Sequence, residues 1–158
     1  MLRLCVTNHP GDCNMFSLSL LRRAGKCPEY LTDVYCSTIR SVLEYAAELW
    51  HPGLTLEQSR SIEHIQERAM KIIYPTDSYT TAMSKAKLDN LSDRRETMCK
   101  RLFEKISKDD HKLNHLLKKS SNERHTRSKT KFEFPKCRTV RKKKSPINYL
   151  LYKYQDIY

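Results

Sequence analysis

An apolar stripe between Tyr30 and Trp50 constrains the fold of this chain more than any other feature of its sequence. Apolar residues recur there at intervals of three and four, the spacing that places side chains on one face of an α-helix. Pro28 suits the first helical turn, and Pro52 followed by Gly53 would end the helix. The pattern predicts one helix of about five or six turns that packs against the rest of the fold.

Helical patterns also follow and precede this stripe, whereas strand patterns are missing before Phe132. Thr55 and Gln58 have the spacing of a capping box, and Gly25 suits the C-terminal cap of an earlier helix. The further helices are predicted over residues 14–23, 55–73, 78–87 and 90–108, with one or two more turns up to residue 117. The fold class predicted from these patterns is an all-α bundle of four or five helices with an extended, largely disordered basic C-terminal tail.

The expected domain organisation has three parts: an irregular N-terminus (1–13), a helical region (14–117) and a basic, tyrosine-containing tail (118–158). The core of the helical region is predicted from the two strongest stripes, one before and one after Pro52. Its members are Leu31, Val34, Tyr35, Ile39, Val42, Ala46, Trp50, Ile62, Ile65, Ala69 and Ile72.

The net charge of +12 is distributed unevenly along the chain. Residues 1–75 hold 8 Lys/Arg and 8 Asp/Glu, whereas residues 76–158 hold 22 and 10. Residues 111–146 alone carry 13 Lys/Arg against two glutamates. A neutral front half joined to a cationic rear half indicates binding to nucleic acid or to another anionic surface.

The candidate nucleic-acid-binding residues are cations of this rear half, interleaved with tyrosines that would stack on unpaired bases. The cations are Lys118, Lys119, Arg124, Arg127, Lys129, Lys131, Lys136, Arg138, Arg141, Lys142, Lys143 and Lys144; the tyrosines are Tyr149, Tyr152 and Tyr154. The simpler interpretations of the same residues are a solubilising charged tail and, for Arg141–Lys144, a nuclear import signal.

No pattern in the chain predicts an active site, a metal site or a cofactor site. Cys5, His9 and Cys13 match no common zinc spacing, and His111 and His115 lack the glutamate of a zinc hydrolase motif. The paired carboxylates at residues 109 and 110 read as a solvated helix end. The six scattered cysteines suggest reduced thiols, and no apolar run is long enough to span a membrane, so we expect an intracellular protein, nuclear or cytoplasmic.

Three stretches together resemble one region of a known family. They are Val34-Tyr-Cys-Ser-Thr-Ile-Arg-Ser-Val-Leu-Glu-Tyr-Ala, Trp50-His-Pro-Gly-Leu-Thr and Ile65-Gln-Glu-Arg-Ala-Met-Lys-Ile-Ile. In this order they resemble the segment after the catalytic palm in reverse transcriptases of non-LTR retrotransposons, of the LINE, jockey-like type. The likeness continues through Leu91-Ser-Asp-Arg-Arg-Glu and Phe134-Pro-Lys-Cys-Arg-Thr, and it covers roughly residues 20–154.

The resemblance implies a thumb and post-thumb fragment of an RNA-directed DNA polymerase, which would help to hold an RNA or DNA template and primer beside a palm domain. The Tyr-x-Asp-Asp signature of the palm is missing, so it implies no catalysis by this chain alone. Ser41 stands where the family usually has proline, and Ala47–Leu49 where proline often precedes the tryptophan; both changes favour an unbroken helix. Two alternatives stay open: a helical protein–protein interaction module and a relic of a truncated element.

Overall fold

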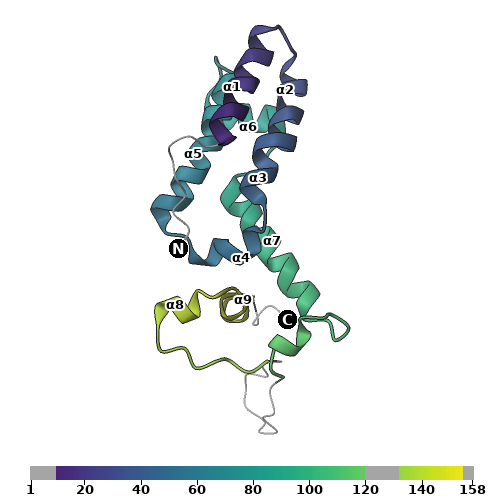
Figure 1. Cartoon of the computed structure of the whole chain (residues 1–158), viewed down its shortest axis with the longest axis vertical. Coiled ribbons are helices and arrows are strands. Elements are labelled where there is room, and N and C mark those ends of the chain that lie inside the picture. Colours follow the sequence, from purple (N-terminus) through teal and green to yellow (C-terminus); the bar gives the residue numbers. More distant parts are fainter. Residues whose placement is uncertain (1–9, 120–131, 155–158) are drawn as a thin grey trace. The chain divides into compact units, whose positions relative to one another are not determined.

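The computed structural model describes residues 10–119 and 132–154 (Figure 1). Within these ranges the regular elements are helices and none is a strand, so the predicted all-α class is confirmed there. None of the helices in this part of the chain is both long enough and apolar enough to cross a membrane. The chain divides into two compact units: unit 1 is Met1–Tyr45 with Leu56–Ser92, and unit 2 is Ala46–Thr55 with Asp93–Tyr158.

Unit 1 is a cluster of helices whose apolar faces meet in one core. Its elements are α1 (Pro10–Arg23), α2 (Pro28–Val34), a π-helix (Tyr35–Arg40), α3 (Ser41–Glu44), α5 (Leu56–Ile73) and α6 (Tyr79–Ala86). The buried core residues are Met15, Leu18, Leu31, Tyr35, Ile39, Ala69, Met70, Ile73, Ala82 and Met83. The guanidinium of Arg22 on α1 donates to the last carbonyls of α5, those of Ile72 and Ile73, where the negative end of the helix dipole lies.

A fully buried glutamine, Gln66, joins three segments of unit 1. Its Oε1 accepts a hydrogen bond from the Tyr35 hydroxyl at 2.9 Å, and its Nε2 donates to the hydroxyl of Tyr79 and to the carbonyl of Asp89, each at 3.2 Å. A buried amide is tolerated only when its polar atoms find partners, and here they do. Burial also raises the pKa of Tyr79 to about 12, so both phenols of the network stay protonated.

The helix predicted between Tyr30 and Trp50 is interrupted, which corrects the expectation from the sequence. Between α2 and α3 the chain forms the π-helix, and each π-turn holds one residue more than an α-turn, so later side chains are rotated by about 100°. As a result Arg40 is buried beside Ile39, while Val42 is 63% exposed. The placement of Val42 in the core is therefore wrong.

The other predicted core residues are buried to different degrees. The buried ones are Leu31, Tyr35, Ile39, Ile62 and Ala69, and the half-buried ones are Val34, Ala46, Trp50, Ile65 and Ile72. Two residues outside the predicted list, Leu18 and Phe103, are more completely buried than any of the half-buried set. The apolar patterns therefore predicted the buried face of α2 and of α5 correctly, but they predicted burial less well for residues 41–50.

A second break falls at Ala46, which adopts a left-handed backbone with φ 50° and ψ 33°. α3 ends at Glu44, α4 (Ala47–Trp50) begins directly after the break, and the chain passes from unit 1 to unit 2 at this point. No glycine or proline marks the position, and an alanine there costs about 1 kcal/mol or more relative to the helical conformation. The expectation that Ser41 and Ala47–Leu49 favour an unbroken helix is accordingly wrong.

Most other predicted helix ends are confirmed. α5 begins directly after Thr55, α6 is capped by the Ser78 hydroxyl, which accepts from the amide of Thr81 at 3.3 Å, and α7 (Leu91–Ile106) begins directly after Asn90. α1 ends at Arg23 as expected, and Gly25 takes the positive φ, 77°, of its C-terminal cap. It begins at Pro10 rather than after Asn14, because proline fits the first helical turn.

Unit 2 packs α7 against segments that are distant from it in the sequence. Its elements are α4, a 3-10 turn (His51–Gly53), α7 from Asp93 onward, a 3-10 turn (Asn114–Leu116), α8 (Val140–Lys143) and α9 (Pro146–Tyr154). The buried core residues are Cys99, Phe103, Ile106, Leu117, Phe132, Leu150, Leu151 and Tyr154. Burial raises the pKa of the Cys99 thiol to about 11, and the described cysteines 27, 36, 99 and 137 are free thiols.

The expectation of a largely disordered tail is wrong for residues 132–154. Phe132 is 2% exposed and meets the ring of Phe103, with ring centroids 6.3 Å apart. The amide of Glu133 donates to the carbonyl of Lys118 at 2.8 Å, so the chain on the two sides of residues 120–131 is held together. The tail orders because the apolar face of α9 finds its partner on α7, about fifty residues earlier in the chain.

Lys87 allows a test of the energetic cost of a left-handed backbone conformation at a non-glycine residue. It caps α6 with φ 53° and ψ 43°, and its side chain is exposed. Glycine adopts this conformation without the steric cost of a side chain, so we expect Lys87→Gly to raise the free energy of unfolding by about 1 kcal/mol. Urea denaturation followed by circular dichroism measures the change. Ser84→Gly, inside the same helix, should instead lower stability by a similar amount; stabilisation by both variants would contradict the cap assignment.

Candidate nucleic-acid interface

Four consecutive cations, Arg141 to Lys144, form an ordered turn on unit 2, which we call the basic turn. The hydroxyl of Thr139 caps α8 by accepting from the amide of Lys142 at 3.3 Å. All four side chains of the basic turn are exposed. Because the backbone is fixed by the cap, the four positive charges are presented from one short helical turn rather than along a random coil.

Asn148 on α9 anchors the basic turn from the other side. Its Nδ2 donates to the carbonyl of Lys142 at 2.8 Å and also lies 3.5 Å from the sulfur of Cys137. The amide of Tyr149 donates to the carbonyl of Ser145 at 2.9 Å and continues α9 directly from the turn. The charges on α8 are therefore carried by the same helix that enters the core of unit 2.

The charge of the basic turn is not neutralised by neighbouring carboxylates. In the part of the chain that the structure describes, no Asp or Glu lies within ion-pair distance of these four side chains. Lys136 and Arg138, just before α8, are exposed as well. The segment from residue 136 to residue 144 thus presents six exposed cations, which is the pattern expected of a surface that meets a polyanion.

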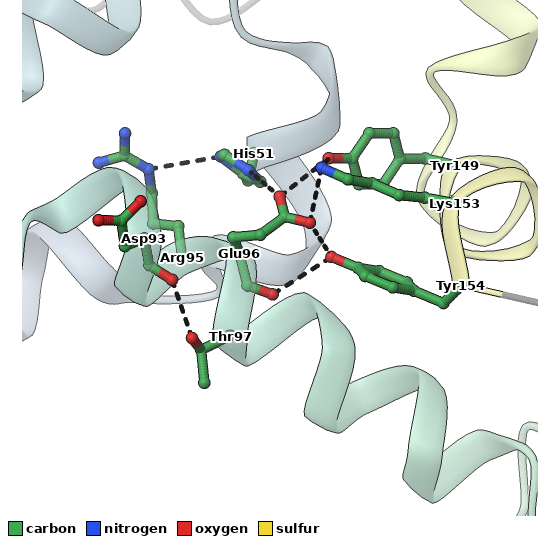
Figure 2. A network of polar contacts seen from close by, with 8 residues as sticks. All are labelled: His51, Asp93, Arg95, Glu96, Thr97, Tyr149, Lys153 and Tyr154. Carbon is green, nitrogen blue, oxygen red and sulfur yellow. Dashed lines mark hydrogen bonds and ion pairs between the residues drawn. The ribbon is translucent and has the colours of Figure 1, made fainter. Parts of the chain in front are cut away.

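A single carboxylate, Glu96 on α7, fixes α9 in place (Figure 2). Its Oε2 accepts from the hydroxyl of Tyr149 at 3.0 Å, and its Oε1 accepts from the ammonium of Lys153 at 2.7 Å and from the hydroxyl of Tyr154. Three side chains of α9 therefore converge on one residue of α7. Burial alone would raise the pKa of Glu96, but the hydrogen bonds from Lys153, Tyr154, His51 and Tyr149 outweigh it and lower the pKa to about 2.

The fourth donor to Glu96 is His51, from the 3-10 turn after α4. Its Nε2 lies 3.1 Å from the Glu96 carboxylate, and its Nδ1 accepts from the Nε–H of Arg95 at 3.4 Å. Since Arg95 can only donate, Nδ1 carries no proton and the imidazole is neutral with its proton on Nε2. Burial lowers the pKa of His51, in agreement with the neutral form. Both ring nitrogens are occupied by the network, so His51 is no free base.

Two of the three tyrosines predicted to stack on bases, Tyr149 and Tyr154, belong to this network. Tyr154 is 4% exposed, and Tyr149 is half-buried with the ammonium of Lys153 lying 5.2 Å from its ring centroid. The rings of His51 and Tyr149 are perpendicular, with centroids 6.3 Å apart. Tyr149 and Tyr154 therefore hold α9 on α7 through their hydroxyls.

Tyr152 is placed differently: it lies two residues before Tyr154 and therefore on nearly the opposite side of α9 from that buried ring. It is 41% exposed and packs against Phe134, which is 37% exposed; their ring centroids lie 5.3 Å apart with an interplanar angle of 30°. The Tyr152 hydroxyl donates to the carbonyl of Pro135 at 2.6 Å. The ammonium of Lys143 lies 5.9 Å from the centroid of the Tyr152 ring. The structure thus joins one aromatic pair to the basic turn.

The remaining predicted cations are separate from this surface or lie outside the described residues. Lys118 and Lys119 are exposed, and Lys119 forms an ion pair with Asp109 at 3.0 Å. Arg124, Arg127, Lys129 and Lys131 lie outside the described residues. Lys136, Arg138 and Arg141–Lys144 are the predicted cations that the structure brings together with Tyr152.

The other residues considered for chemistry form no site in the part of the chain that is described. No group of three His, Cys, Asp or Glu side chains there could hold a metal ion. Asp109 and Asp110 are exposed, and the Nδ1 of His111 accepts from the amide of Leu113. Cys5 and His9 lie outside the described residues.

Comparison with known proteins adds no relative. No protein-family model, no curated protein and no solved structure matches this chain.

Sequence reasoning missed the residues that shape the interface, namely Glu96, Asn148 and Phe134. Glu96 sits in a run of charged residues on α7 and gave no sign of burial. Asn148 is a single polar residue in an apolar stretch, which is a usable signal for a helix or turn anchor. No local pattern around Phe134 indicates that it packs against Tyr152. Each acts through a contact that links distant parts of the sequence.

Replacing Glu96 tests the network directly. Glu96→Gln keeps the shape but removes the charge that accepts from Lys153 and the tyrosines, so we expect a loss of about 1.5–3 kcal/mol in the free energy of unfolding. Denaturation followed by circular dichroism measures the loss. Glu133→Gln is the matched control, because Glu133 is exposed and its side chain is outside the network; an equal loss in both variants would contradict the role of Glu96.

The depressed pKa of Glu96 predicts a pH dependence. The carboxyl titrates near 4.5 in the unfolded chain and at about 2 in the folded one, so its stabilising contribution is complete above pH 4.5 and is lost as the pH falls toward 2. The stability difference between wild type and Glu96→Gln should therefore be largest near neutral pH and shrink steadily below about pH 4.5. A difference that stays constant down to pH 2 would show that the charge of Glu96 is irrelevant.

Proposed function

We propose that this chain binds RNA or DNA through the basic turn, with little sequence preference and without catalysis. The exposed, ordered run Arg141–Lys144, which has no acidic neighbour within ion-pair distance among the described residues, carries this proposal. Such cations neutralise phosphates and release counterions, which drives binding to any nucleic acid. Cations that contact phosphates make no hydrogen bonds with the edges of the bases, so the sequence preference is weak.

The resemblance of the sequence to the region after the palm of non-LTR reverse transcriptases supports the proposal independently. In that interpretation the chain is a thumb and post-thumb fragment of an RNA-directed DNA polymerase that holds template and primer, and a palm domain is its partner. The fragment lacks the Tyr-x-Asp-Asp signature, so it would contribute binding but no chemistry. An origin as a relic of a truncated element would leave the binding surface in place but without a role.

A second function, protein binding by unit 1, is favoured by one observation. Val42, Tyr45 and Leu56 are 63%, 80% and 80% exposed, more than a monomeric core protein needs to leave in water. A helical protein–protein interaction module would use such residues. Association with a partner protein that survives high salt, together with no binding of nucleic acid, would favour this function over the first.

The salt dependence of binding tests the proposed function. We expect the full chain to bind oligonucleotides with an affinity that falls steeply between about 50 and 200 mM salt, by up to 10³–10⁵ if about 6–10 phosphates are contacted. Replacing Arg141, Lys142, Lys143 and Lys144 by alanine should weaken binding to all sequences alike and flatten the slope of log affinity against log salt by about three. Fluorescence anisotropy measures both quantities.

The matched control removes the same charge from unit 1. Alanine at Arg23, Arg60, Arg68 and Lys71, which are all exposed, lowers the net charge equally but leaves the basic turn intact. Point variants are preferable to a chain that ends near Leu117, because such a truncation would remove Leu150, Leu151 and Tyr154 from the core. Equal weakening by the two quadruple variants would mean that only overall charge matters and would refute a localised interface.

A further inference from the structure

Phe134 and Tyr152 form an exposed aromatic pair that is built into the fold but that the core does not need. Neither ring belongs to the buried core of unit 2, and each keeps more than a third of its surface in water. The two rings lie 5.3 Å apart and are tilted by 30°, close to an offset stack. Apolar ring surface that stays in water is unfavourable in free energy, and a ligand that covered the two rings would remove that cost.

The pair is held rigidly in orientation. The Tyr152 hydroxyl donates to the carbonyl of Pro135, one residue after Phe134, so the bond locks the ring against the segment that carries its neighbour. Tyr152 also lies one helical turn after Asn148, whose side chain holds the carbonyl of Lys142. The rings and the basic turn are therefore fixed on the same face of α9.

The surroundings of the pair identify the class of ligand. The ammonium of Lys143 lies 5.9 Å from the Tyr152 ring centroid, and exposed Lys136 and Arg138 follow Phe134 in the sequence. A ligand that covers the rings must also tolerate a dense positive field, so it should carry flat apolar groups on a negatively charged chain. Single-stranded nucleic acid meets both conditions, because its bases are free to stack and its phosphates are anionic.

We propose that the Phe134–Tyr152 pair is a base-stacking platform that makes this interface prefer single strands over duplexes. This inference rests on the proposed function and deepens it. In a duplex the bases are already stacked on each other, so the rings gain nothing and only the basic turn contributes. In a single strand an unpaired base covers the rings while the phosphates on either side of it meet Lys143 and its neighbours.

The test compares the full chain with the double variant Phe134→Leu, Tyr152→Leu on three probes of equal length: oligo(U), oligo(dT) and a DNA duplex. Leucine keeps an apolar side chain at each site but removes the flat ring. Loss of the rings should weaken binding to single strands about five- to hundred-fold and leave duplex binding within about two-fold. Tighter binding of oligo(U) than of oligo(dT) would identify RNA as the ligand, and the reverse would identify DNA; either supports the platform.

Two controls separate stacking from damage to the fold. The conservative variant Phe134→Tyr, Tyr152→Phe keeps both rings and should retain the single-strand preference, although it loses the hydroxyl bond to Pro135. Phe16→Leu changes a more exposed ring on unit 1, 63% exposed, and should change no affinity. Circular dichroism of each variant confirms that its helices are intact.

The outcomes distinguish failure of this inference from failure of the proposed function. Equal binding of single strands and duplex, still dependent on Arg141–Lys144, would overturn the platform and leave the interface standing. An unchanged single-strand preference in the double leucine variant would also overturn it, as expected if the rings dock a protein instead. Failure of the full chain to bind any of the three probes would overturn both.

Discussion

The candidate interface depends on one carboxylate. Glu96 accepts hydrogen bonds from His51 and from three side chains of α9, and this convergence fixes both the position and the rotation of that helix. Tyr154 turns toward Glu96, and two residues at about 100° each place Tyr152 on nearly the opposite side of α9 from it, where it packs against Phe134. The network thus decides which side of α9 holds the helix and which side, with Tyr152, stays exposed.

Unit 1 relies on a buried polar group in a comparable way. Gln66 satisfies its amide through Tyr35, Tyr79 and the backbone at Asp89, so one side chain of α5 sets the positions of the π-helix, of α6 and of the segment before α7. Apolar contacts are not directional and would tolerate sliding, whereas these hydrogen bonds have fixed geometry. In both units the apolar surface supplies the driving force and a single polar residue specifies the arrangement.

The two units differ in what their surfaces offer. Unit 1 exposes apolar residues such as Tyr45 and Leu56. On unit 2 the ammonium of Lys143 lies 5.9 Å from the centroid of the exposed Tyr152 ring, and exposed Lys136 and Arg138 follow Phe134 in the sequence. A ligand for the second surface must be both flat and anionic, which is a narrower requirement than hydrophobicity alone. The proposed nucleic-acid site is therefore placed on unit 2.

The sequence by itself determined the all-α class, the ends of α5, α6 and α7, and the concentration of charge in the rear half. These features follow from local rules, namely capping residues, helical periodicity and composition. Only the tertiary structure decided the π-helix, the break at Ala46 and the ordering of residues 132–154. None of these three features leaves a local signature in the sequence. Each is stabilised by contacts between segments that lie far apart in the chain. The three tyrosines Tyr149, Tyr152 and Tyr154 also could not be told apart from the sequence. Tyr149 and Tyr154 bind Glu96, about fifty residues earlier in the chain, whereas Tyr152 is exposed at the surface.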